Sequence, residues 1–334
     1  MPVITLDTDT EFARIVTELT RRRLLAGGLG AATLFGLAAC GSSGEPATGS
    51  ATPPTRRVDT AKGPVDVPAN PTRIVSIQPS ATATLYDLGV APVGVYDQGA
   101  EYISPRYVSQ WSAAPKIGTA AEIQIEKVAA LRPDLIIGAD FPWNTDSYDK
   151  LSALAPTVIT PVTSWQAGAK ATADAVDKLD TLAALEKQVA DRSEEIRTKH
   201  AAVLARYRWD ILQGGFDAGQ FWVYGPESEA GTILAAAGVQ FATASAETAG
   251  DTINKVSYEQ IEVLADADVI GFYAGYDGKP NNKGPELFAQ KGFTRLAAVQ
   301  ASRLVPIPDF LPGGYGDALA ILDELEAGLT KLAA

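Results

Sequence analysis

The sequence predicts an α/β protein built from two doubly wound parallel-sheet lobes that are joined by a single long helix. The first observation is a repeat: the segment 125–138 recurs at 258–271, so that Glu126 matches Glu259. The second is that short apolar runs alternate with helical segments in both halves of the chain. The third is the stretch 182–207, which is rich in Ala, Glu, Lys and Arg and contains neither Gly nor Pro.

The amino-acid composition of the chain excludes several kinds of protein. The chain has 334 residues, of which 46% are hydrophobic and 20% charged, as in soluble proteins with substantial cores. Its net charge of −12 argues against a nucleic-acid partner. A single cysteine excludes an intrachain disulfide, and a single histidine argues against a zinc or manganese site. We therefore expect neither a protein-held metal nor a cofactor.

Residues 1–39 are predicted to be a signal peptide of the Tat type. The pair Arg21-Arg22 precedes an apolar run over residues 24–39, which is shorter than the ~20 residues of a membrane-spanning helix. The run ends in small residues before Cys40, as in a bacterial lipobox. Cleavage there would leave Cys40 as a lipidated N-terminus that carries an acyl chain such as palmitate. An uncleaved anchor is the alternative.

Residues 40–71 are predicted to be a flexible tether, because the segment 41–55 is rich in Gly, Ser, Pro and Thr. Together with the leader, this places the folded body outside the cytoplasm, held at the cell membrane by a lipid.

The N-terminal lobe is predicted over residues 72–164. Its buried strands are expected at 74–77, 92–96, 135–138 and 157–160, with helices between them. Ligands of parallel sheets bind beyond the carboxyl ends of the strands. This rule selects the following residues near strand ends: Gln78, Ser80, Tyr96, Phe141 and Trp143.

Residues 165–207 are predicted to be linking helices. The second of them, 182–207, would span about 39 Å and form a stiff connector. His200 lies on it with no ligand-type neighbour, so we expect a solvated helix residue.

The C-terminal lobe is predicted over residues 208–334 and repeats the plan of the first. Strands are expected at 209–213, 220–224, 269–273 and 304–307, and Ser257 to Gln260 form a capping box at the start of the second repeat. The strand-end rule here selects five aromatic residues: Trp222, Tyr224, Tyr273, Tyr276 and Phe310.

No catalytic motif accompanies these residues: there is no Gly-x-Ser-x-Gly elbow, no P-loop and no dinucleotide fingerprint. Each aromatic side chain alone could serve core packing. Together they favour a cleft for a bulky, partly apolar ligand. Glu126 and Glu259 could each serve only the helix dipole. As a matched pair they could instead bind two arginine pockets on a symmetric partner.

With these residues in hand, the segment 72–334 resembles the class III periplasmic-binding proteins, the substrate-binding lipoproteins of ABC importers for iron–siderophores, haem and cobalamin. The resemblance implies that Glu126 and Glu259 dock onto arginines of the permease dimer. It also matches Phe141 and Phe310 to aromatic residues of ferric-hydroxamate binders. An arginine that those binders carry is replaced here by Thr119.

The resemblance and the residues together predict a monomeric, membrane-tethered receptor. It would capture a ferric siderophore between its lobes and deliver it to an ABC permease dimer with its ATPase. The siderophore, not the protein, would hold the iron. Haem or cobalamin is the alternative ligand, and a surface hydrolase is the alternative class.

Overall fold

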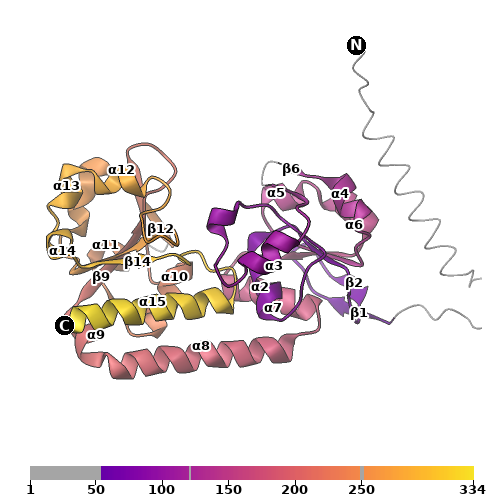
Figure 1. Ribbon diagram of the computed structural model, residues 1–334, viewed down its shortest axis with the longest axis horizontal. Coiled ribbons are helices and arrows are strands. Elements are labelled where there is room, and N and C mark those ends of the chain that lie inside the picture. Colours follow the sequence, from indigo (N-terminus) through magenta and orange to yellow (C-terminus); the bar gives the residue numbers. More distant parts are fainter. Residues whose placement is uncertain (1–53, 120–121, 249–251) are drawn as a thin grey trace, which may run out of the picture.

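The computed structural model describes residues 54–119, 122–248 and 252–334. The predicted leader, Cys40 and the first part of the predicted tether lie outside the described residues. Two α/β lobes stand beside each other, with helix α8 (Leu179–Lys199) running beneath both of them (Figure 1). The predicted fold class is confirmed. In the described part of the chain, no helix is both long and apolar enough to cross a membrane.

The N-terminal lobe holds a four-stranded parallel sheet in the order β4-β3-β7-β8. All five residues of β7 are buried, as expected for a parallel sheet covered on both faces. The strands are β3 (Ile74–Ser76), β4 (Gly94–Val95), β7 (Leu135–Ala139) and β8 (Thr157–Thr160). The helices are α2 (Pro79–Asp87), α3 (Val108–Ala113), α4 (Ile125–Ala130), α5 (Pro142–Thr145), α6 (Tyr148–Leu154) and α7 (Trp165–Ala175), with a 3₁₀ turn η1 (Ala100–Tyr102) and a hairpin of β5 (Gly118–Thr119) and β6 (Glu122–Ile123).

A β-hairpin precedes this lobe and corrects the predicted tether. Strands β1 (Thr55–Val58) and β2 (Val65–Pro68) pair antiparallel, within the segment 40–71. Val58 and Val67 are buried in the same core cluster as the first strand of the lobe. Alternating valines supply an apolar face that the lobe buries, so the ordered body begins well before residue 72.

The connector is shorter than predicted, and its histidine is buried. Helix α8 ends at Lys199, and a separate helix α9 (Ala201–Arg206) follows. His200 lies at this break with only 8% of its surface exposed, and its Nε2 is 3.5 Å from an Oε1 of Glu326. The expectation of a solvated His200 is therefore wrong. The helix changes direction there and turns the ring inward.

The C-terminal lobe holds a mixed six-stranded sheet in the order β12-β10-β9-β13-β14, with β11 beside β9. Only β10 runs against its neighbours. The strands are β9 (Arg208–Gln213), β10 (Gln220–Tyr224), β11 (Gln240–Phe241), β12 (Ile253–Ser257), β13 (Val269–Tyr273) and β14 (Leu304–Ile307). The helices are α10 (Glu229–Ala236), α11 (Thr243–Ala246), α12 (Gly284–Phe288), α13 (Lys291–Thr294), α14 (Ala297–Gln300) and α15 (Tyr315–Ala333), with a 3₁₀ segment η2 (Tyr258–Leu264).

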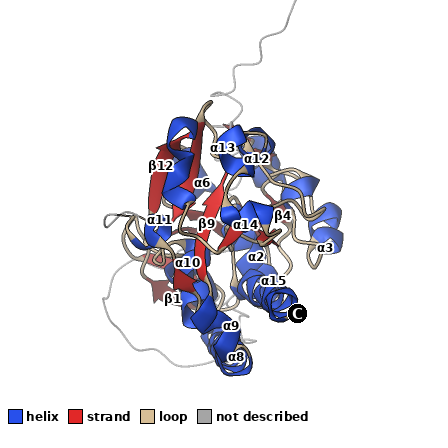
Figure 2. Ribbon diagram, turned by 90° about the vertical axis from the view of Figure 1, so that its left-hand side faces the viewer, coloured by secondary structure: helices blue, strands red, loops and turns tan. Residues whose placement is uncertain are grey.

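Helix α15 adds a second link between the lobes. It packs along α8, as both views show (Figure 1 and Figure 2), and its first turn packs on α2 of the other lobe. Gly314 and Gly316 make this approach possible, because a Cβ atom at either position would collide with the carboxylate of Asp87. The backbone N–H of Gly316 donates to that carboxylate at 2.9 Å. The lobes therefore meet over a tight, polar seam.

The two copies of the sequence repeat differ in their helical part. The first forms α4 followed by β7, whereas the second forms the 3₁₀ segment η2 followed by β13. A kink at Gln260 interrupts η2, and the Ser257 hydroxyl caps it by accepting from the N–H of Glu259. The repeat therefore preserves a turn of helix before a buried strand, but not the type of helix.

Candidate functional site

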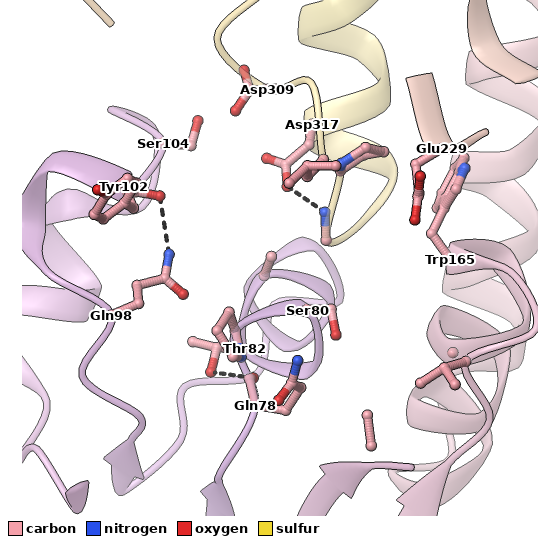
Figure 3. A pocket seen from close by; sticks show the side chains of 18 of the residues that line it. Gln78, Ser80, Thr82, Gln98, Tyr102, Ser104, Trp165, Glu229, Asp309 and Asp317 are labelled. Atoms are coloured by element: carbon pink, nitrogen blue, oxygen red, sulfur yellow. Dashed lines mark hydrogen bonds between the residues drawn. The ribbon is translucent and has the colours of Figure 1, made fainter. Parts of the chain in front are cut away.

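A cavity of about 520 Å³ lies between the lobes and is lined by residues of both (Figure 3). Six of the residues selected by the strand-end rule line it: Gln78, Ser80, Tyr96, Phe141, Tyr273 and Tyr276. They lie at or after the ends of β3, β4, β7 and β13.

Trp143 stands next to the cavity and supports two of its walls. Its ring stacks on Phe141 with centroids 4.6 Å apart and an angle of 6° between the planes. Its Nε1 donates to Oε1 of Gln78 at 3.2 Å. The ring itself is 39% exposed and does not line the cavity, so its contribution is to orient Phe141 and Gln78.

Three predicted ligand contacts lie elsewhere. Tyr224 and Phe310 are fully buried in the core of the C-terminal lobe, where their rings meet edge to face at 4.8 Å. Trp222 packs against Phe216 and Lys255, away from the cavity. Both Trp222 and Tyr224 lie within β10, which runs antiparallel to β9. The residues that reach the cavity from this strand are those that follow it, Glu227 and Glu229.

The loop after β14 presents a different residue from the one predicted. Phe310 turns inward against Tyr273, whereas Asp309 and Leu311, on either side of it, line the cavity. A pattern of aromatic residues at strand ends does not reveal Asp309, the carboxylate that stands directly before Phe310.

A polar network closes one side of the cavity and joins the lobes. Arg106 lies between two carboxylates of the C-terminal lobe, at 3.7 Å from Asp309 and 3.5 Å from Asp317. The Tyr276 hydroxyl donates to Asp309 at 2.6 Å, and the N–H of Gly313 donates to Asp317 at 2.9 Å. The single guanidinium of this network is thus engaged by two carboxylates.

Burial shapes the charge of this network. It raises the pKa of Asp317 to about 7, and the negative charge of Asp309 adds to the shift, while the Gly313 amide and Arg106 oppose it. Burial also raises the pKa of Asp309. The pKa of Tyr276 is raised by burial and then by Asp309, so its hydroxyl keeps its proton and can donate. The Asp317 carboxyl therefore titrates near neutral pH, and the charge of Asp309 influences it.

The opposite side of the cavity holds a second group that the sequence did not reveal. Glu229 begins helix α10, where the Ser228 hydroxyl caps the helix by accepting from the N–H of Gly231 at 3.1 Å. Glu227 and Glu229 both line the cavity. Figure 3 shows Glu229 beside Trp165, which starts α7 of the other lobe. A charged residue in a capped first turn after a strand is the signal that could have found Glu229.

The two glutamates of the repeat do not line the cavity. Glu126 is exposed in the first turn of α4, and Glu259 is exposed at the start of η2. Helix α4 lies at the upper edge of one lobe in Figure 1, and α13, on which η2 packs, lies at the upper edge of the other. Helix α4, which carries Glu126, and helix α13, against which the segment of Glu259 packs, therefore both lie on the side of the molecule opposite α8.

The site has the composition of a binding site. As far as the structure describes it, the lining contains aromatic rings, amides, hydroxyls and carboxylates, but no cysteine or histidine. Across the described ranges, no group of three or more His, Cys, Asp or Glu side chains is arranged to hold a metal ion. Such a cleft can enclose a molecule of several hundred Å³ by stacking and hydrogen bonding.

Two α/β lobes that enclose a cavity and are joined by one helix define a two-lobed solute-binding protein. A model of the periplasmic binding protein family matches residues 74–310, so the chain belongs to that family. It is 28% identical over 320 residues to the probable siderophore-binding lipoprotein YfiY of Bacillus subtilis, which covers 88% of this chain and 94% of the relative.

Solved structures agree with this assignment. The siderophore periplasmic binding protein from the fuscachelin gene cluster of Thermobifida fusca superimposes with a TM-score of 0.68 at 29% identity, covering 79% of this chain and 98% of that one. The FhuD protein from S. pseudintermedius superimposes with a TM-score of 0.63 at 28% identity, covering 83% and 98% respectively.

Proposed function

We propose that this chain is the substrate-binding component of an ABC importer, which captures a ferric siderophore between its lobes and delivers it to a permease dimer with its ATPase. The observation that carries the proposal is the cavity of about 520 Å³ between the lobes of a periplasmic binding protein. Its volume falls in the usual range of ligand pockets, about 300–1,000 Å³. The named function of the Bacillus subtilis relative supports the same class of ligand.

In this proposal the protein recognises the outside of the complex, and the siderophore holds the iron. Phe141, backed by Trp143, offers a flat apolar face, and Tyr96 and Tyr273 add rings on other sides of the cavity. Gln78 contributes an amide whose orientation is fixed by Trp143. The proposal includes no catalytic step, because the lining offers no nucleophile with a histidine or cysteine partner.

The decisive experiment is quenching of tryptophan fluorescence, since Trp165 lines the cavity and Trp143 stands beside it. Ferrioxamine B, ferrichrome, a ferric tris-catecholate, hemin and cobalamin would be titrated in turn, with the iron-free siderophores as controls. We expect saturable quenching by at least one ferric siderophore. A shift of the Soret band with hemin, without quenching by any ferric siderophore, would replace the proposal with haem binding.

We further propose export through the Tat route and anchoring by a lipid on Cys40, with the protein acting as a monomer outside the cytoplasm. The twin arginines and the small residues before Cys40 support this. Replacement of Cys40 with Ser should release the protein from the membrane fraction. Replacement of Arg21 and Arg22 with Lys should block export, and unchanged export would indicate the Sec route.

A further inference from the structure

The charged residues that line the cavity are all of one sign. Among the described residues of the lining, four are carboxylates, namely Glu227, Glu229, Asp309 and Asp317, and none is Lys, Arg or His. The nearest guanidinium in the polar network, that of Arg106, is already shared between Asp309 and Asp317. The cleft therefore offers no free positive charge to an anionic ligand.

Glu229 is the carboxylate best placed to hold a ligand. Its Oε2 is buried and has no hydrogen-bond partner within the described part of the chain. Nε1 of Trp165, beside it in Figure 3, is equally without one there. A buried acceptor that lacks a donor is costly, because it has lost its water and gained nothing in return. A donor that arrives with a ligand would remove this cost.

Tyr86 is an independent sign of a polar ligand in the same cavity. It lines the cavity with only 8% of its surface exposed, and its hydroxyl has no partner among the described residues. Burial raises the pKa of Tyr86 to about 12, so the hydroxyl is a donor at neutral pH. It is suited to an oxygen atom of the ligand, whereas Glu229 is suited to a positively charged donor.

We propose that the cleft selects ferric siderophores that carry a cationic group, such as a protonated amine, which binds the Glu229 carboxylate, and that it rejects anionic ferric complexes. This inference rests on the proposed function and narrows its ligand class. An anion in the cleft would lose its hydration and meet the carboxylates of Glu227 and Glu229, which form no ion pair with any described residue. A cationic group would instead supply Glu229 with the donor that it lacks.

The test compares two ligands that differ in one charge. Ferrioxamine B carries a pendant ammonium group, and N-acetylation removes that charge without altering the iron centre. The full chain should bind ferrioxamine B at least about tenfold more tightly than its N-acetylated form, which corresponds to about 1.4 kcal/mol. Binding of a ferric tris-catecholate should be weaker than that of either.

The variant Glu229→Gln keeps the shape of the side chain and removes its charge. It should reduce the preference for ferrioxamine B to less than about threefold, mainly by weakening the binding of ferrioxamine B. Glu247→Gln is the matched control, because Glu247 is an exposed residue of the same lobe and does not line the cavity. It should leave the preference unchanged.

The results separate this inference from the proposed function. Equal binding of the two ferrioxamines, an unchanged preference in Glu229→Gln, or tightest binding of the tris-catecholate would overturn the inference and leave siderophore binding in place. If no ferric siderophore in the panel is bound, the inference and the proposed function both fail.

Discussion

The two lobes share a plan but contribute different chemistry to the cleft. Each has a turn of helix that carries an exposed glutamate and leads into a buried strand. The described part of the N-terminal lobe lines the cavity with aromatic and aliphatic groups, amides and hydroxyls, whereas the four described carboxylates of the lining all come from the C-terminal lobe, which also contributes Tyr273 and Tyr276. The repeat thus preserves the scaffold and the outer surface, while the inner surfaces differ in charge.

This difference between the lobes depends on which segments reach the cavity after the strands of each sheet. In the four-stranded sheet of the N-terminal lobe every strand is parallel, and the segments after β3, β4 and β7 all reach the cavity. In the C-terminal lobe β10 is reversed, and its Tyr224 lies in the core. The cavity receives the first turn of α10, which follows β10, together with residues at the ends of β13 and β14.

The lobes are most alike at Glu126 and Glu259, and charge reversal tests whether they act alike. Changing both to Lys should abolish siderophore uptake and leave the affinity for the ligand unchanged, because neither residue lines the cavity. Each single reversal should lower uptake by more than about tenfold. Uptake of radioactive ferric siderophore by cells measures this, with Glu247→Lys as control. Normal uptake by the double variant would limit both residues to stabilising their own helical turns.

The lobes should differ most clearly at the phenylalanines that follow β7 and β14. Phe310→Ala should lower the free energy of unfolding by about 3–5 kcal/mol, because its ring is fully buried between Tyr224 and Tyr273. Phe141→Ala should cost only about 1 kcal/mol, since that ring is half-buried and mainly stacks on Trp143. Urea unfolding measures both losses. Similar losses for the two variants would remove this distinction between the lobes.

Phe141, whose replacement should affect stability only slightly, should have a large effect on ligand binding. Its replacement with Ala should weaken binding of the ferric siderophore about tenfold, through loss of the flat face that lines the cavity. Trp143→Ala is a graded comparison, because Trp143 only supports Phe141 and Gln78, and it should weaken binding by a smaller factor. Fluorescence titration gives both affinities. A larger effect of Trp143→Ala would mean that the tryptophan itself contacts the ligand.

The stability of the protein should depend on pH through Asp317, a residue of the C-terminal lobe. Asp317 has a pKa that is raised on folding to about 7, from an ordinary value of about 3.9. The folded state therefore binds its proton more tightly, and this contribution to stability is lost as the pH rises through the folded pKa. The free energy of unfolding of the wild type, relative to Asp317→Asn, should fall between about pH 4 and pH 8. A constant difference would show that burial does not perturb this carboxyl.

Sequence patterns were sufficient for the scaffold because it depends on periodicity and on apolar runs. The repeat, the alternation of strands and helices, and the glycine-free connector were enough to predict two α/β lobes. The same patterns located Gln78, Tyr96 and Phe141 at the cleft, since parallel strands end at a common edge. They could not reveal that β10 is reversed, because strand direction depends on partners that are distant in the sequence.

The charged residues of the site could not be predicted from the sequence for a related reason. Arg106 meets Asp309 and Asp317 only when the lobes come together, and nothing local marks these residues as neighbours. The burial of His200 likewise depends on a break between α8 and α9 that the uninterrupted helical composition conceals. The valines in the predicted tether did not indicate strands, because Gly, Ser and Pro are frequent in that segment.

The stiffness of helix α8, which joins the lobes, has a consequence for the rate of uptake under the proposed function. Helix α8 has 21 residues and spans about 31 Å, and α15 braces it along the seam. We expect a frame braced in this way to present nearly the same outer surface whether its cleft is full or empty. If Glu126 and Glu259 are the docking points, empty receptors would compete with loaded ones for the permease. The rate of uptake would then follow the fraction of receptors that are loaded, and an excess of receptor during iron scarcity would slow import.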